Sequence, residues 1–273
     1  MAWGIAVLII WMLARTDVAM DAASDACRLF VTCVMPGLLP YMTLSQMLIT
    51  RIGRPMPASA VILIGWGGGS PTGAALLHHG EGLPAAVKRR IAVSCATMSP
   101  MFLLGTLSGW LSSRAAAFCI FAGVLAGGWL AGRLAGKSSG FRVEVPKRPV
   151  SFGTAVESVM RTMLLVCGTM AVLRMTAALI TDVLPPASPV ILPITTLLEV
   201  TTGAQVIAGL PLPLHIRAAI LAAATGFGGA AIILQNHAVM PEDTLGLIPQ
   251  ILWQALHAVF SFLITLGLGW LIL

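Results

Sequence analysis

The sequence has little charge and few aromatic residues. Only 10% of its 273 residues are Asp, Glu, Lys or Arg, whereas 58% are hydrophobic, and the mean hydropathy is +0.94. A soluble domain of this length needs far more charged surface than that. Several windows of about 20 residues are almost free of charge, and this is the length of helix that crosses a bilayer. The composition therefore excludes a soluble fold and predicts an all-α, polytopic protein of the cell membrane.

Motifs for catalysis and for metal binding are also missing. The five cysteines form no CxxC pair and lie in apolar segments, where cysteine serves as a small hydrophobic residue. No histidine has a partner at metal-ligand spacing, and there is no GxSxG, HExxH or Walker motif. The net charge of +6 comes without a basic stripe interleaved with aromatics. We therefore expect no enzymatic activity, no cofactor, no metal and no nucleic-acid partner.

Positive charge gathers in three clusters, at 51–54, 88–90 and 133–148. Lys and Arg accumulate in the cytoplasmic loops of membrane proteins. If the segment 58–78 crossed the membrane, the first two clusters would lie on opposite sides. If it dips in and returns, all three clusters are cytoplasmic. The charges therefore predict a re-entrant hairpin, followed later by a basic cytoplasmic loop at 137–152.

A glycine-rich interruption, GGGSPTG at 67–73, lies inside this apolar hairpin segment. In hydrocarbon every backbone N–H and C=O must be paired, so such a break needs surrounding protein or a water-filled cavity. Ser99–Pro100 predicts a second break, within an expected span at 91–111. We therefore predict a helical hairpin with its tip at 67–73 and a broken membrane helix after it.

The second half of the chain repeats this order. The segment 23–136 aligns with 154–267 at an offset of about 131 residues, and both share Thr-Gly-Ala, at 72–74 and 202–204. LLEVTTGAQVI provides a second hairpin (188–212), and AAATGFGGAAIILQ provides a second broken span. Each half contains a span, a hairpin, a broken span and a span, and the two halves begin on opposite sides. Inverted repeats with discontinuous helices are a recurring design of secondary transporters.

These patterns divide the chain into four parts. They are an N-terminal transmembrane helix and loop (1–22), repeat 1 (23–136, hairpin 58–83), the basic loop (137–152) and repeat 2 (153–273, hairpin 188–212). Seven spans are expected, at 2–14, 23–49, 91–111, 115–134, 153–180, 218–234 and 245–273. The first has the length of a signal peptide but lacks a positive n-region and a clean cleavage site, so we expect a retained helix. The second should be interrupted by Pro36 and Pro40.

The motif segments also resemble a known family. GGGSPTGAALL, VKRRIAVSCATMSPMFLLGTLSG, LLEVTTGAQVIAG and AAILAAATGFGGAAIILQ look like the Gate, or nucleoside-recognition, membrane domain. Their order and spacing are closest to the sporulation integral membrane protein of the YlbJ type, from about Asp25 onward. The resemblance implies two hairpins and a site for a small solute, in an architecture similar to concentrative nucleoside transporters.

Candidate binding residues come from the two hairpin tips and the two breaks. N–H groups at a half-helix N-terminus attract polar or anionic solutes. Glu199 lies inside an apolar run, where an ionisable group is costly and indicates a function. The predicted substrate-binding residues are Gly68, Gly69, Ser70, Thr72, Gly73, Thr97, Ser99, Glu199, Thr201, Thr202, Gly203, Gln205, Thr225 and Gly226.

Each candidate has a structural alternative. Glu199 would bind a proton, a coupling cation or a solute hydroxyl, or else its carboxyl is paired with backbone or Thr groups. The glycines would expose backbone donors to a solute, or else form a tight turn packed between helices. Gln46, Gln235 and Asn236 could line a cavity, but hydrogen bonds between helices are their expected role.

Two functions are compatible with these sequence features. The first is a transporter-like protein of the Gate domain type, which moves a nucleoside or another small polar solute across the lipid bilayer by alternating access. The second is a non-transporting structural or partner-recruiting membrane protein of sporulation. Either function is compatible with a homo-oligomer.

Overall fold

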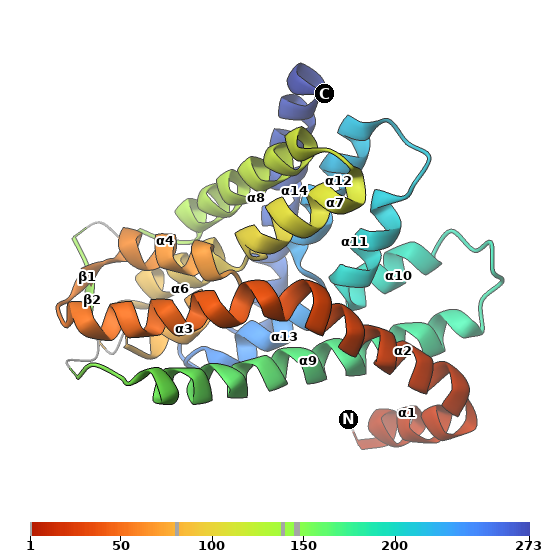
Figure 1. Cartoon of the computed structure of the whole chain (residues 1–273), viewed down its shortest axis with the longest axis horizontal. Helices are drawn as coiled ribbons and strands as arrows, with labels where there is room; N and C mark the ends of the chain where they lie inside the picture. Colours follow the sequence, from red (N-terminus) through yellow and green to blue (C-terminus); the bar gives the residue numbers. More distant parts are fainter. Residues whose placement is uncertain (1, 80–81, 138–139, 145–147) are drawn as a thin grey trace.

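The computed structural model describes residues 2–79, 82–137, 140–144 and 148–273, and most of them are helical (Figure 1). The α-helices are α1 (Ala2–Ala14), α2 (Thr16–Leu29), α3 (Met35–Ile52), α4 (Ala58–Gly68), α5 (Thr72–Leu76), α6 (Ala85–Cys95), α7 (Leu107–Leu111), α8 (Arg114–Ala135), α9 (Phe152–Asp182), α10 (Ile191–Leu198), α11 (Val200–Ala208), α12 (Leu214–Phe227), α13 (Gly229–Val239) and α14 (Leu247–Ile272). The other elements are η1 (Phe30–Val34), η2 (Leu77–His79), η3 (Met101–Thr106) and the strands β1 (Met56–Pro57) and β2 (Arg142–Val143).

Among the described residues, five helical stretches are long and apolar enough to cross a membrane. They are Thr16–Ile52, Arg114–Ala135, Phe152–Asp182, Leu214–Val239 and Leu247–Ile272. This agrees with an all-α polytopic membrane protein, but not with seven spans. The expected span 2–14 forms α1, whose 13 residues are fewer than the about 20 that a span needs. The expected span 91–111 is divided between α6, η3 and α7 by a break at 96–100.

The first long stretch continues through the two prolines that were expected to interrupt it. The π-helical segment η1 ends directly before α3, and Pro36 occupies the first turn of α3. Pro36 has no N–H to donate to the preceding turn, and a π-turn accommodates such a local change in helix register. Pro40 lies inside α3, which continues to Ile52 and ends at Gly53 with φ +57°. The interruption is therefore a local change of winding, not the end of the helix.

Two short helix pairs lie where the hairpins were expected. Helices α4 and α5 are joined by residues 69–71, and α10 and α11 are joined by Glu199 alone. We call these links the first turn and the second turn. The partners in each pair pack against each other, and Figure 1 shows α4 and α10 at opposite sides of the molecule.

The three basic clusters meet at the end of the molecule where α4 begins. Strand β1 pairs antiparallel with β2, so that Pro57 lies opposite Arg142. Arg89 Nε donates a hydrogen bond of 2.6 Å to the carbonyl oxygen of Ala135. Leu77, at the far end of the first hairpin, joins the same hydrophobic cluster as strand β1. The start of α4 and the residue after the end of α5 thus lie in one cluster at this end of the molecule, which we call the basic end.

The second hairpin belongs to the other end. Ala208, the last residue of α11, shares a hydrophobic cluster with Leu111, at the end of α7, and Ala218 of α12. Helix α8 begins beside this cluster and finishes at the basic end. The pair α4–α5 therefore lies toward the basic end, and the end of α11 lies toward the opposite end of the bundle.

Small residues bring α8 and α14 close together. A Cβ atom on Gly127 would lie 2.5 Å from Ser261 Oγ, and one on Gly123 would clash with Thr265. His257 Nε2 lies 2.9 Å from the carbonyl oxygen of Val124. Glycines at such an interface allow membrane helices to approach and polar side chains to bond between them. The interface between α8 and α14 is therefore a close helix–helix contact within the bundle.

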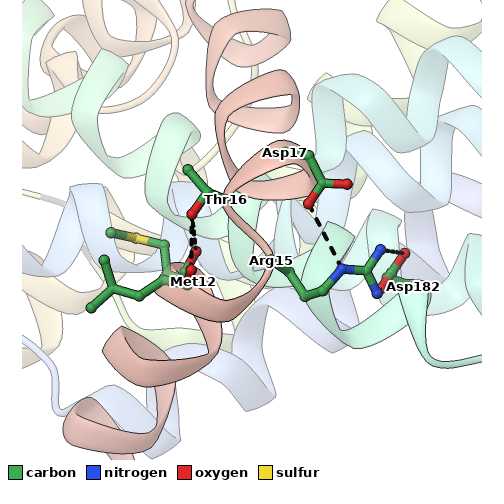
Figure 2. A network of polar contacts seen from close by, with 6 residues as sticks. Met12, Arg15, Thr16, Asp17 and Asp182 are labelled. Carbon is green, nitrogen blue, oxygen red and sulfur yellow. Dashed lines mark hydrogen bonds and ion pairs between the residues drawn. The ribbon is translucent and has the colours of Figure 1, made fainter.

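An ion pair fixes the N-terminal helices to α9 (Figure 2). Arg15, between α1 and α2, donates from Nη2 to Asp182 Oδ1 at 3.0 Å, and its Nη1 bonds Oδ2. Its Nε lies 3.7 Å from Asp17 Oδ1. A bidentate arginine–carboxylate contact fixes the relative orientation of the two side chains as well as their distance. The start of α2 is therefore tied to the last residue of α9, and α1 buries none of its residues.

Candidate functional site

The first turn packs against the helix break at 96–100. Gly69 has φ +69°, a conformation that glycine adopts readily, and a Cβ atom there would lie 2.4 Å from Ser99 N. Ser70 N donates to the carbonyl oxygen of Thr97 at 2.6 Å. A Cβ atom on Gly73 would lie 2.1 Å from Cys95 Cβ. The glycines of the predicted tip therefore form a tight turn packed between helices.

The second turn is built on Glu199, which caps helix α11. Its Oε1 accepts from Thr201 N at 2.9 Å, and its Oε2 accepts from Thr202 N at 2.8 Å and Thr202 Oγ1 at 2.7 Å. The residue is only 1% exposed. Donors at a helix N-terminus stabilise a carboxylate. The hydrogen bonds from Thr201 and Thr202 thus offset the free-energy cost of burying the Glu199 side chain.

The second turn also packs against a break, the one between α12 and α13. Gly228 and Gly229 have φ +80° and +66°. A Cβ atom on Gly229 would lie 3.0 Å from the carbonyl oxygen of Thr196, in α10. In each half of the chain, therefore, the hairpin turn packs on the glycine- or proline-containing break of the same half.

The two turns line one small cavity, which we call the central cavity. Its volume is about 40 Å³. Ser70 comes from the first turn and Ser99 from the break at 96–100. Glu199 comes from the second turn, Thr201 from the start of α11 and Gln235 from α13. A buried water needs about 10–15 Å³, so the cavity has room for a few waters or a small ion. It is far smaller than the roughly 300–1,000 Å³ of typical organic-ligand pockets.

A larger cavity lies beyond the first turn, between α3, α5 and α9, and we call it the vestibule. Its volume is about 320 Å³, and Ile49 and Val150 place it toward the basic end. Its polar lining consists of Ser45, Gln46, Thr50, Thr72, Ser158 and Thr162. Thr72 Oγ1 is buried with no hydrogen-bond partner among the described residues. Ser70, in the first turn, therefore lines the central cavity, and Thr72, the first residue of α5, lines the vestibule.

The structure brings some of the predicted site residues together. Ser70, Ser99, Glu199 and Thr201 line the central cavity. Thr97 is fully buried in the first break, and its hydroxyl has no partner in the described part of the chain. Thr202 bonds Glu199, while Gly68, Gly69, Gly73 and Gly203 are in close contact with neighbouring side chains or backbone.

Three predicted residues lie away from the central cavity. Gln205 is exposed on the outer face of α11. Thr225 Oγ1 donates to the carbonyl oxygen of Leu221 at 2.7 Å, within α12. Gly226 packs on Ser261 of α14. Gln205 therefore lies on the exposed face of α11, and Thr225 and Gly226 lie on faces of α12 that take part in helix packing.

Other lining residues were not among the predicted ones. Gln235 was expected to form a hydrogen bond between helices, with a place in a cavity wall as the alternative. It does both: its Nε2 donates to the Val166 carbonyl oxygen at 3.5 Å, and it lines the central cavity. An apolar wall is added by Val34, Leu38, Val166 and Met170, from η1, α3 and α9. Nothing in the local sequence distinguishes these four from the other apolar residues of their helices.

Comparison with known proteins gives no relative, because no family model, no curated protein and no solved structure matches the chain. Over the residues that the structure describes, no group of three or more His, Cys, Asp or Glu side chains could hold a metal ion. The geometry of the two turns and the two cavities is therefore the basis for a proposal of function.

Proposed function

We propose that this chain is a transporter-like protein of the cell membrane, which moves a small polar solute through the vestibule and the central cavity. One observation supports this most. Ser70, in the first turn, lines the central cavity, and Thr72, two residues later at the start of α5, lines the vestibule, so that one short segment reaches both cavities. Alternating access needs a polar site that a short element closes from one side at a time. The first turn has the position of such a gate.

The two hairpins are proposed to be re-entrant, and the two halves to be inverted repeats. The pair α4–α5 lies toward the basic end, the end of α11 lies toward the opposite end, and each turn packs on the break of its own half. In inverted-repeat transporters, equivalent segments of the two repeats typically enter the membrane from opposite sides. Because Lys and Arg accumulate in cytoplasmic loops, the basic end is proposed to face the cytoplasm. The vestibule is then the cytoplasmic entrance.

Glu199 is the proposed coupling group. An ionised carboxylate offers about four acceptor positions, and donors within the chain use three of them. Glu199 also lines the central cavity, whose volume suits a water or a small cation. A proton or cation there would meet a carboxylate beside the two serine side chains that line the cavity. A nucleoside would need the cavity to widen, which a movement of the first turn would allow.

A disulfide across the gate tests this proposal. The five native cysteines are replaced, and Ser70→Cys is combined with Asn236→Cys, two positions whose side chains now share a hydrogen bond of 2.6 Å. Saturable uptake of radiolabelled nucleosides and other small polar solutes into proteoliposomes is measured. We expect uptake by the cysteine-free parent, loss of uptake on oxidation of the double variant, and recovery with a reductant. Each single-cysteine variant, oxidised in the same way, should keep its uptake.

The absence of saturable uptake for every solute, or uptake that persists in the cross-linked protein, would contradict the proposal. The second function, a structural or partner-recruiting membrane protein as in sporulation, would then be preferred. Its support is that Glu199 is satisfied by its own helix and that Gly69, in the first turn, is closely packed. In that case Glu199→Ala lowers stability and changes no solute binding.

A further inference from the structure

A separate pocket of about 410 Å³ at the basic end contains three arginines. Arg90 comes from α6, Arg133 from the end of α8 and Arg142 from β2. The start of α4, at Ala58 and Ser59, forms another side. We call this the arginine pocket. It shares no lining residue with the vestibule or the central cavity.

The positive charge of this pocket has no acidic partner among the described residues. None of the ion pairs formed by those residues includes Arg90, Arg133 or Arg142. Glu144, two positions from Arg142, is exposed and makes no ion pair there. Arg90 Nε is buried with no hydrogen-bond partner in the same described set. Burial lowers the pKa of Arg90, and the nearby charge of Arg133 lowers it further. A bound anion would offset both the burial of the Arg90 guanidinium and its repulsion by Arg133.

Two of the arginines are held in place by uncharged groups. The guanidinium carbon of Arg133 lies 5.2 Å from the ring centre of Trp129, a cation–π contact. Arg142 Nη1 donates to the carbonyl oxygen of Pro55 at 3.3 Å, and its backbone pairs with Pro57. A site whose side chains are already positioned loses less conformational freedom when a ligand binds. The arrangement is therefore suited to a ligand that replaces the missing counter-charge.

The start of α4 contributes further donors. This helix has 11 residues, and Pro57, at the N-cap position, provides no side-chain cap. The first N–H groups of a helix have no partner within the helix, and its N-terminus carries a partial positive charge. Uncapped N-termini of this kind bind phosphate. Ala58 and Ser59, the first residues of α4, line the same pocket as the three arginines.

We propose that the arginine pocket binds a phosphate group through Arg90, Arg133, Arg142 and the first N–H groups of α4. The planar fork of arginine matches the oxygens of a phosphate, and basic pockets at the ends of membrane helices bind lipid headgroups. The phosphate comes either from an anionic phospholipid of the adjacent leaflet or from a free phosphate-bearing solute. Both sources present the same chemistry to the pocket, and experiment separates them.

The test uses the full chain in dodecyl maltoside, a detergent without a phosphate group. The pocket variant is Arg133→Gln with Arg142→Gln, and the matched control is Arg51→Gln with Arg148→Gln, which removes the same charge outside the pocket. All four side chains belong to exposed residues, so both variants should fold, and their unfolding midpoints without ligand check this. One arm titrates phosphatidylglycerol and counts retained lipid by native mass spectrometry. The other arm titrates inorganic phosphate and follows the unfolding midpoint.

We expect the parent to bind in at least one arm, and the pocket variant to bind about tenfold more weakly for each guanidinium removed. The control should stay within about twofold of the parent, because exposed charges contribute little. Lipid retention without a response to inorganic phosphate assigns the pocket to a headgroup, and the reverse result assigns it to a free phosphate. Arg133→Lys, which keeps the charge but not the fork, should also weaken binding. No binding in either arm, or an equal loss in the control, overturns the proposal.

Discussion

Ser70 Oγ donates a hydrogen bond of 2.6 Å to Asn236 Oδ1, and the two residues are 166 positions apart in the chain. Both side chains are buried. Ser70 belongs to the first turn, and Asn236 belongs to α13, directly after the second break. The hairpin of one half is therefore bonded to the broken helix of the other half. A movement of the first turn must break this bond or move α13 with it.

The first prediction concerns this bond. Ser70→Ala removes the donor and leaves Asn236 Oδ1 buried without a partner, which costs about 1–3 kcal/mol of unfolding free energy. We expect a lower midpoint of denaturant-induced unfolding in detergent. Ser108→Ala is the matched control, because Ser108 Oγ bonds only to the nearby carbonyl oxygen of Gly105. The control should change stability by less than about 0.5 kcal/mol. Equal effects at both serines would show that the bond contributes nothing.

The second prediction concerns the capping role of Glu199. Glu199→Ala removes the acceptor for three donors and should cost about 0.5–2 kcal/mol, the usual range for a lost cap. Glu199→Gln should also destabilise the protein, because both carboxylate oxygens now accept from N–H groups and an amide nitrogen would meet one of these donors. Unfolding of the three proteins in detergent measures this. If Glu199→Gln is as stable as the parent, the carboxylate is not required as a cap.

The positions of turns and breaks could be predicted from the sequence because their signals are local. Glycine or Ser-Pro inside an apolar segment predicts an interruption, and breaks are present at 96–100 and at Gly228–Gly229. The basic clusters predicted a shared end for 51–54, 88–90 and 133–148, and the strand pair joins the first and third of them. In each case the residues that predict the feature lie within a few positions of it in the sequence.

The composition of the cavities could not be predicted in the same way. Gln205 and Gln235 are both glutamines in apolar helices, but the first is exposed and the second lines the central cavity. Which face of a helix lines a cavity depends on the helices that surround it, and the chain places those neighbours far away in sequence. The π-helical η1 was missed for a related reason, since nothing near Pro36 indicates that the helix continues. The arginine pocket likewise depends on contacts between distant segments.

The third prediction separates two glycines. Gly69→Ala should destabilise the protein strongly, because Gly69 has positive φ and its Cβ atom would lie 2.4 Å from Ser99 N, a backbone atom that cannot move aside. We expect a loss of folded yield, or at least about 1–3 kcal/mol of stability, the range for a strained backbone. Gly168→Ala, inside α9 with no atom within 4 Å of its Cβ position, should be neutral or stabilising. Equal tolerance at both sites would argue against a closely packed first turn.

The last prediction is an asymmetry within one ion pair. Lys88 Nζ lies 2.6 Å from Asp243 Oδ2, and the side chains are 8% and 67% exposed. Asp243→Ala leaves a buried ammonium group without its partner, which should cost about 1–3 kcal/mol. Lys88→Met leaves a carboxylate that water can solvate, and keeps the buried methylene packing, so stability should change by less than about 0.5 kcal/mol. As a control, Glu157→Gln breaks the exposed Arg161–Glu157 pair and should cost no more than about 0.5 kcal/mol. Unfolding midpoints of the three variants measure the difference. A larger loss for Lys88→Met than for Asp243→Ala would mean that the lysine contributes through other contacts than this pair.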